Sequence, residues 1–524
     1  MSDLLLLSPI LLCGLTGVLV LVLDLLAAPG TSGFLGYVVA AGFALSGVAA
    51  FAAWGGDTPF SAPYLTGMLH PDACARFFAV LCLAAGAFTA LLFVTGLAVE
   101  GIDQGEIHAL LAFSATGMLV VIAAIDLVAI FLGLEILSLA LYALTASKRT
   151  SPVCVEAGVK YFVLGGVATA LFLFGVALLF GATGKFDLVG IARHFAEHDP
   201  TRDWILPQTA LLFLVAALGF KVAAVPFHFW TPDVYEGAPS PVVPFMAGAV
   251  KAAGFAVLAR ILLTVYQDPG FQALPLAVPD VLLVLAVASM TIGNLLGIVQ
   301  TDVRRILAYS SIAHAGYVLL GVYATRELPG DLDGLGPSVP FYVATYAAAT
   351  LGAFGIVSLV AGRGDANLDR LAGMGRRHPL LSFLLLLCLL SLAGVPPLAG
   401  FLGKFELFRD VLSADPERNL PWVLVAVLNS VVALYYYLCV AVAVCFRDAA
   451  GDATPTNRSI PGALAVGAAA LFCVYAGLFP GKLLTASDQA ARAAVIVSEK
   501  AGPKPAEPER KAKPVHKRPS RKAS

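Results

Sequence analysis

The chain has 524 residues, of which 59% are hydrophobic and only 13% charged, and its formal net charge is −1. An average soluble domain has about 25% charged residues, so this composition excludes an ordinary soluble protein. The sequence has neither a GxGxxG fingerprint after a strand nor a GxxxxGK[ST] loop, and we therefore expect no nucleotide site and no nucleic-acid partner.

Apolar windows of about 20 residues recur along almost the whole chain, and each is long enough to cross ~30 Å of hydrocarbon as a helix. We predict about fourteen membrane-spanning helices, at residues 4–26, 33–54, 74–98, 107–124, 127–147, 153–182, 207–231, 241–266, 279–300, 303–324, 340–362, 379–414, 421–446 and 460–480. The runs are continuous and do not alternate, which excludes a β-barrel. Asp3 replaces the basic cluster of a secretory signal, so the first run is predicted to be a span.

Four ionisable residues lie inside these predicted spans: Glu135, Lys221, Lys251 and Lys404. Glu135 is ~13 Å along its helix and Lys221 ~21 Å along its own, at 1.5 Å per residue. A charge at the centre of a membrane helix costs ~2.5 to 3.5 kcal/mol on insertion scales. Residues placed there at such a cost indicate a function.

Prolines interrupt two of the spans next to buried lysines. Pro226 follows Lys221, and Pro396 and Pro397 precede Lys404. Proline frees backbone groups that dry lipid contact would not tolerate, so we predict that the seventh and twelfth spans are discontinuous. Their separation by five spans suggests an internal duplication with inverted topology.

The buried charges have a structural and a functional interpretation. A buried ion pair such as Glu135 with Lys221 would fix helix packing, but three lysines cannot all pair with one glutamate. In a proton pathway, an apolar site lowers the pKa of a lysine and a nearby carboxylate raises it again, so moving the carboxylate switches the proton. We favour the proton pathway.

Other polar residues are weaker candidates. A lone histidine in a span is often a packing residue, and an aspartate at a helix end is often an N-cap. The secondary candidates for proton transfer are Lys160, His228 and His314, and the predicted caps are Asp126, Asp233 and Asp302. The eight cysteines are scattered without a CxxC pair, which favours packing and predicts no metal site.

Lysine and arginine concentrate in the connections after odd-numbered spans, which by the positive-inside rule face the cytoplasm. With an even number of spans, both termini are then predicted to be periplasmic. The segment 483–524 is rich in Lys, Arg and Pro and is predicted to be a disordered basic tail.

Several stretches together resemble one family of membrane proteins. They are FLGLEILSLALYAL, EAGVKYFVLG, GFKVAAVPFHFWTPDVYEGAPSPV, DVRRILAYSSIAHAGYVLLG and LAGVPPLAGFLGKFELF. They resemble the antiporter-like membrane subunits of respiratory complex I, in particular subunit N of NADH-quinone oxidoreductase. The resemblance covers nearly the whole chain before the tail. Lys251 in MAGAVKAAGF is similar to subunit N, where the sister subunits L and M tend to have a histidine-bearing motif.

The resemblance implies an all-α polytopic fold with two inverted five-helix repeats, spans four to eight and nine to thirteen, and discontinuous seventh and twelfth spans. The expected parts are an N-terminal three-helix segment, two antiporter-like repeats, a last transmembrane helix and the tail, at residues 1–106, 107–266, 279–446, 460–482 and 483–524 respectively.

The resemblance also implies a proton-translocating subunit of NADH-quinone oxidoreductase in the bacterial inner membrane. Glu135 and Lys221 would be the switching pair, Lys251 the central relay and Lys404 the exit-side lysine. This chain would hold no cofactor, whereas NADH, FMN, iron–sulfur clusters and quinone would bind to partner subunits. Its partners would be the lipid bilayer and the other antiporter-like and small hydrophobic subunits. The alternatives are a subunit of a multi-subunit cation/proton antiporter and a structural membrane scaffold.

Overall fold

The computed structural model describes residues 3–27, 31–56, 60–102, 104–198, 205–266, 278–325, 335–361, 366–448 and 459–495. The first part of the chain forms α1 (Asp3–Leu26), η1 (Ser32–Phe34), α2 (Leu35–Ala53), α3 (Pro63–Thr66) and α4 (Ala73–Glu100). The next part forms α5 (Glu106–Ala123), α6 (Leu127–Thr145), α7 (Pro152–Thr183), α8 (Leu188–Glu197), α9 (Ile205–Val222), α10 (Trp230–Gly237), α11 (Val243–Phe245), η2 (Met246–Val250) and α12 (Lys251–Val265). The remainder forms α14 (Val278–Ile298), α15 (Val303–Ala324), α16 (Ser338–Ala361), α17 (Leu368–Leu371), α18 (Met374–Arg377), α19 (Pro379–Ala393), α20 (Ala399–Ala414), α21 (Pro416–Phe446), α22 (Ile460–Leu478) and α23 (Gly481–Arg492).

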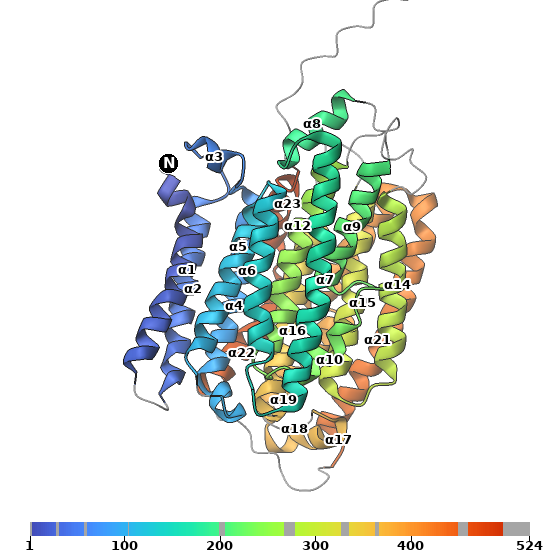
Figure 1. Ribbon diagram of the computed structural model, residues 1–524. Helices are drawn as coiled ribbons and strands as arrows, with labels where there is room; N and C mark the ends of the chain where they lie inside the picture. Colours follow the sequence, from blue (N-terminus) through green and yellow to red (C-terminus); the bar gives the residue numbers. More distant parts are fainter. Residues whose placement is uncertain are drawn as a thin grey trace, which may run out of the picture.

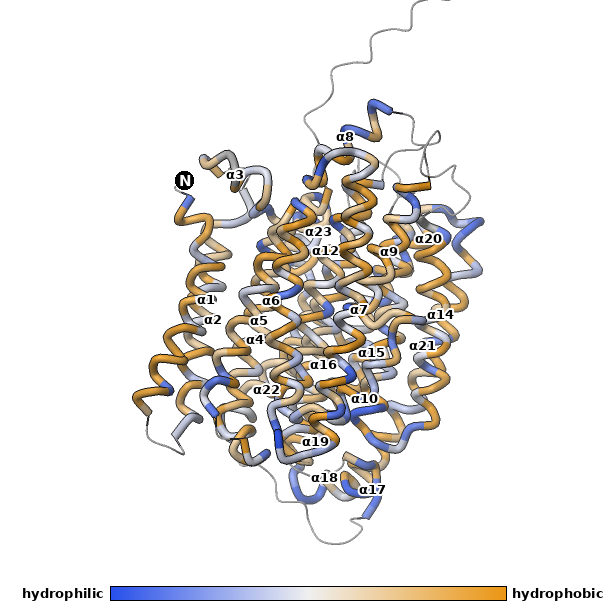
Figure 2. Tube along the Cα trace, viewed as in Figure 1, coloured by the Kyte–Doolittle hydropathy of each residue, from blue (hydrophilic) through white to orange (hydrophobic). Residues whose placement is uncertain are grey.

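The long helices stand side by side as a bundle, with short helices at both ends (Figure 1). In the described residues, 13 helices are long and apolar enough to cross a membrane. The broken span formed by α19 and α20 adds one crossing, so the prediction of about fourteen spans is confirmed. Hydrophilic segments gather around α8 at one end and around α17 and α18 at the other (Figure 2).

Two spans are interrupted at the positions predicted from the prolines. The seventh is split into α9 and α10 by residues 223–229, and the twelfth into α19 and α20 by residues 394–398. Each break contains a cis X–Pro bond, Val225–Pro226 in the first and Pro396–Pro397 in the second. The freed backbone groups find partners: the Val225 N–H donates to Ser289 Oγ (2.9 Å) and the Gly400 N–H to Ser391 Oγ (3.1 Å).

The two repeats show the same local pairing at opposite ends of the bundle. In the first, the backbone N–H groups of Leu127 and Leu188 donate to the carbonyls of Phe186 and Ile125. In the second, the N–H groups of Val303 and Leu368 donate to the carbonyls of Ala366 and Thr301. The first pairing lies beside α8 and the second beside α17, which are at opposite ends of the molecule (Figure 1). The repeats are therefore inverted, as predicted.

The centre of the bundle is made of α12, α15 and α16. The spans 243–265 and 338–361 are buried along their whole apolar windows, and 303–324 is buried over 94% of its window. By contrast, α1, α2 and α7 are buried on one side only. Polar side chains of the three central helices are thus held away from lipid by protein.

The N-terminal helices are attached to the first repeat by a buried ion pair that the sequence analysis did not identify. Arg260 Nη2 in α12 lies 2.9 Å from Asp72 Oδ1, and both side chains are almost fully buried. Asp72 also caps α4, because the same oxygen accepts a hydrogen bond from the Ala75 N–H. One carboxylate thus starts a helix and ties it to another span.

Two expectations need correction. The predicted tail begins too early: residues 481–492 form α23, which packs against α4 and α16 because Ser487, Ala490 and Ala491 give it a buried side. Residues 496–524 lie outside the described part of the chain. The other correction concerns Asp233, which does not cap a helix but pairs with Lys160 and Arg305. The caps at Asp126 and Asp302 are confirmed.

Candidate functional site

Lys221 lies in the last turn of α9, just before the first break, and is only 4% exposed. Its ammonium donates to Ser138 Oγ of α6 at 2.5 Å. The rings of Tyr142, Tyr161 and Phe220 lie 5.7 to 6.0 Å from Nζ. The cation is therefore stabilised by one hydroxyl and by aromatic rings.

Glu135 lies on α6 one turn before Ser138 and accepts a hydrogen bond from Thr169 Oγ1 of α7 at 2.7 Å. It forms no ion pair with Lys221 within 4.0 Å, so the structural interpretation of these two residues as a buried ion pair is not supported, and their role as a switching pair stays a prediction. A small cavity of about 10 Å³ is lined by Lys221 and by Thr169, the residue that holds Glu135. This is close to the smallest space that holds one water molecule.

Lys251 is 1% exposed and begins α12 directly after η2, a π-helical turn. Its ammonium donates to the Ser311 carbonyl (2.9 Å) and to Ser311 Oγ of α15. Tyr346 of α16 donates to the same Ser311 Oγ (2.9 Å) and lies 3.3 Å from the Ala247 carbonyl in the π-helical turn. The irregular turn thus places a backbone carbonyl beside the tyrosine hydroxyl that contacts Ser311, next to the buried lysine.

His314 occupies the middle of α15, one turn after Ser310 and Ser311. Its Nδ1 lies 2.6 Å from the Tyr342 hydroxyl and its Nε2 3.1 Å from the Tyr437 hydroxyl, which in turn bonds to Ser310 Oγ. Both ring nitrogens are therefore engaged with groups that donate or accept protons.

Lys404 lies in α20 just after the second break and is 5% exposed. Its ammonium donates to the carbonyls of Leu392 (3.1 Å) and Ala393 (3.2 Å), which end α19. It also lies 5.1 Å from the centre of the Tyr317 ring. The break therefore supplies the carbonyls that hold this lysine.

One face of α15 lies between Lys251 of the first repeat and Lys404 of the second. Ser310, Ser311, His314 and Tyr317 recur at helical spacing, and all are buried. The His314 ring lies 5.0 Å from the Tyr346 ring and 5.7 Å from the Tyr317 ring. Hydroxyl and imidazole groups thus follow α15 from Lys251 to Tyr317, whose ring contacts Lys404, and such groups can pass protons.

The structure separates the secondary candidates. His228 is buried in the first break, and its Nδ1 has no hydrogen-bond partner. Lys160, by contrast, has a side chain that is 41% exposed and pairs with Glu156 (2.7 Å) and Asp233 (2.8 Å). Lys160 therefore lies outside the buried series.

The sequence analysis missed most of the neutral hydrogen-bond partners in the series. Thr169, Ser138, Tyr342, Tyr346 and Tyr437 are neutral, and their side chains do not stand out in an apolar run as a charge does. The spacing of Tyr342 and Tyr346, four residues apart on one helix face, was the available signal. In the described residues, no group of three or more His, Cys, Asp or Glu could hold a metal ion.

Comparisons with known proteins agree with this geometry. Residues 124–433 match the family model described as NADH:quinone oxidoreductase/Mrp antiporter, transmembrane. This matched region includes the three buried lysines, the half-buried Glu135 and both breaks.

Curated relatives and a solved structure extend the match. The chain is 46% identical to NADH-quinone oxidoreductase subunit N 1 of Sorangium cellulosum, over 75% of this chain and 76% of that protein. It is 36% identical to NADH-quinone oxidoreductase subunit N of Trichlorobacter lovleyi, over 92% and 96%. It also matches a chain of respiratory complex I from Thermus thermophilus, with a TM-score of 0.74, 34% identity and coverage of 91% and 98%.

Proposed function

Because the chain belongs to the family of NADH-quinone oxidoreductase subunit N, the antiporter-like membrane subunits of complex I, we propose that its buried lysines move protons across the membrane. The energy comes from electron transfer between NADH and quinone in other subunits. At ~2.3 kcal/mol per charge per 100 mV, the membrane potential sets the load that each proton must overcome.

One observation supports the proposal most strongly: Lys221, Lys251 and Lys404 are all buried, and each is held by neutral oxygens. None of the three pairs with a carboxylate within 4.0 Å, and all three lie in the described part of the chain. A purely structural buried cation normally needs a charged partner. Neutral partners do not fix the charge of a lysine as a carboxylate does: a hydroxyl can accept from the ammonium or donate to the neutral amine, and a carbonyl can accept from either form, so each lysine can lose its proton in place.

Glu135 is the proposed switch for Lys221. The carboxylate is held by Thr169, and Thr169 and Lys221 line the same small cavity, whose volume is close to that of one water molecule. Movement of Glu135 towards Lys221 favours the protonated lysine, and movement away favours proton release. A change in charge at the contact with a neighbouring subunit would drive this movement.

From Lys221 the proton passes to Lys251 and then, through Ser311, His314 and the tyrosine hydroxyls, to Lys404. His228 is the proposed link across the first break, because its unpartnered Nδ1 can bind a bridging water. Lys404 is the exit-side residue. Lys160 is assigned only to the half-exposed cluster of charges that it forms with Glu156 and Asp233, at the start of the path.

We place the chain in the bacterial inner membrane with both termini in the periplasm. The distribution of Lys and Arg among the connections supports this orientation. The flavin, the iron–sulfur clusters, and the NADH and quinone sites are assigned to partner subunits.

The test is Lys221→Met, which keeps the length of the side chain and removes its charge, with Lys185→Met at an exposed position as the matched control. Proton uptake per NADH oxidised is measured in inverted vesicles, and assembly is checked on native gels. Loss of a positioned acid–base group typically costs about 10²- to 10⁴-fold, so we expect the pumping rate to fall at least about tenfold in an assembled complex. Unchanged pumping per NADH would contradict the proposal.

The two alternatives give different results. A scaffold would lose assembly in Lys221→Met while the complexes that form pump normally. A stand-alone antiporter would be purified through a tag on this chain without flavin and iron–sulfur subunits, whereas complex I brings both.

A further inference from the structure

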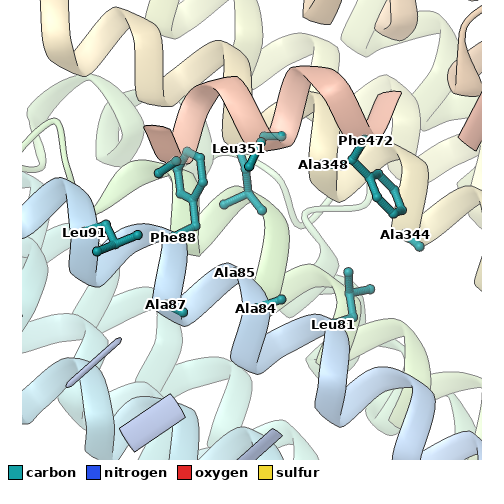
Figure 3. A pocket seen from close by; sticks show the side chains of 13 residues that line it. Leu81, Ala84, Ala85, Ala87, Phe88, Leu91, Ala344, Ala348, Leu351 and Phe472 are labelled. Atoms are coloured by element: carbon teal, nitrogen blue, oxygen red, sulfur yellow. The ribbon is translucent and has the colours of Figure 1, made fainter. Parts of the chain in front are cut away.

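An apolar crevice lies between α4, α16 and α22. Its volume is about 400 Å³. Figure 3 shows Phe88 and Leu91 of α4 towards one end and Phe472 of α22, beside Ala344 and Ala348 of α16, towards the other. All lining side chains are Ala, Leu or Phe.

This lining selects the chemistry of an occupant. Binding of water in the crevice is unfavourable, because a water molecule needs two to four polar partners and the lining side chains offer none. An empty space of this size would forfeit the packing contacts of every lining residue. An apolar chain that carries no polar groups along its length fits both conditions.

The crevice is open to the bilayer. Two of its lining alanines, Ala84 on α4 and Ala468 on α22, are exposed, so the opening lies between these two helices. Along α4 the lining extends from Leu81 to Leu91, which is ~15 Å at 1.5 Å per residue. This is half of the ~30 Å hydrocarbon core, the depth of a single leaflet.

Two cationic side chains, Lys482 and Arg76, lie near the end of the crevice at which a lipid headgroup would be placed. α23 follows the end of α22 and packs across the beginnings of α4 and α16. Its Lys482 is exposed, and Gln489, two turns later on the same helix face, accepts a hydrogen bond from Arg76 of α4 (3.3 Å). Lys482 forms no ion pair with a carboxylate in the described part of the chain. Arg76 has no carboxylate partner there either, although its guanidinium also donates to the Trp54 carbonyl (3.4 Å) and lies over the Phe51 ring.

We propose that this crevice binds one acyl chain of an anionic phospholipid, with its phosphate facing Lys482 and Arg76 at α23. The apolar walls take the chain, and the two cations select the charge of the headgroup. The lipid fills the space between α4, which is the third span, and the helices α16 and α22, and it thereby completes the packing at this face.

The test uses the whole complex in proteoliposomes that contain phosphatidylglycerol or phosphatidylcholine with a photoactivatable diazirine in one acyl chain. After irradiation, cross-linked peptides of this chain are identified by mass spectrometry. We expect labels on the crevice helices within 81–91, 344–351 and 465–472, and stronger labelling by phosphatidylglycerol.

Ala468→Phe fills the opening from an exposed position, so it should not strain the fold. It should reduce crevice labelling roughly tenfold, equivalent to about 1.4 kcal/mol of binding. Ala170→Phe, at an exposed position of α7, is the matched control and should leave the labelling unchanged. Lys482→Gln should remove the preference for phosphatidylglycerol while retaining the acyl-chain label.

Three results would overturn the proposal. They are crevice labelling that Ala468→Phe does not reduce, equal labelling by the two lipids in the unaltered complex, and cross-links from the crevice residues to another subunit in place of lipid. The last result would identify a partner helix as the occupant. Because none of the variants alters a buried lysine, proton pumping reports on the proposed function separately.

Discussion

Tyr437 and Tyr436 are adjacent on α21, but their hydroxyls serve different networks. Tyr437 bonds to His314 and Ser310 in the proposed proton path. Tyr436 donates to Asn294 Oδ1 of α14 at 2.9 Å, outside that path. The pair therefore offers a matched test of the relay with no change in ring volume.

Tyr437→Phe removes one partner of His314 and interrupts the hydroxyl series. Since a single hydrogen bond contributes about 0.5 to 1.5 kcal/mol, we expect the pumping rate to fall by up to about tenfold while assembly is retained. Tyr436→Phe should retain normal pumping. Both rates are measured as NADH-driven uptake in inverted vesicles, and equal rates in the two variants would argue against a relay through His314.

The next scale is that of the helices, where glycine sets how closely they pack. Gly117 of α5 and Gly133 of α6 face each other: a Cβ on Gly117 would lie 2.7 Å from the Gly133 carbonyl oxygen. The second repeat has a similar close contact at a glycine, because a Cβ on Gly316 of α15 would lie 2.6 Å from the Ala286 carbonyl oxygen of α14. Small residues at these points let the backbones approach closely.

Gly117→Ala should push α5 and α6 apart, because the obstacle is backbone and cannot rotate away. Overpacking of this kind typically costs about 1 to 3 kcal/mol. The readout is the temperature at which buried Cys13, whose thiol contacts the Ala112 carbonyl of α5, becomes reactive to maleimide. We expect this temperature to fall.

Gly166→Ala on α7 is the control, since nothing lies within 4 Å of the added methyl group. Alanine is a better helix former by up to about 1 kcal/mol, so this variant should be as stable as the unaltered chain or slightly more so. Equal destabilisation by both changes would show that the close approach of α5 and α6 is not the cause.

At the scale of the whole molecule, the Asp72–Arg260 pair holds the first helices against the first repeat. The pair is buried, and each partner has one atom without a hydrogen bond, Asp72 Oδ2 and Arg260 Nη1. A buried pair is weak support for stability by itself, but breaking it leaves an uncompensated buried charge.

Arg260→Met should therefore destabilise the contact by about 3 to 5 kcal/mol, and the double variant with Asp72→Asn should recover part of this loss because no charge remains unpaired. Cys74 lies two residues from Asp72 and is buried, so its maleimide reactivity on heating reports on this contact. A double variant as unstable as Arg260→Met alone would contradict the charge explanation.

The sequence by itself determined the class of fold, the number of spans, the two breaks and the positions of the buried lysines. Membrane helices are defined by long apolar runs, and a charge or a proline in such a run is conspicuous because its cost in lipid is high. The same reasoning placed the N-caps at Asp126 and Asp302, since capping is a local interaction.

Only the tertiary structure decided which groups the lysines contact. Ser311 meets Lys251, and Leu392 meets Lys404, through helix packing that no local pattern encodes. Packing also moved Asp233 from a predicted cap into an ion-pair cluster, and it ordered α23 at the end of the bundle by burying one side of it. Partners distant in sequence depend on how the helices assemble, whereas the cost of burying a charge is already fixed by the residues around it.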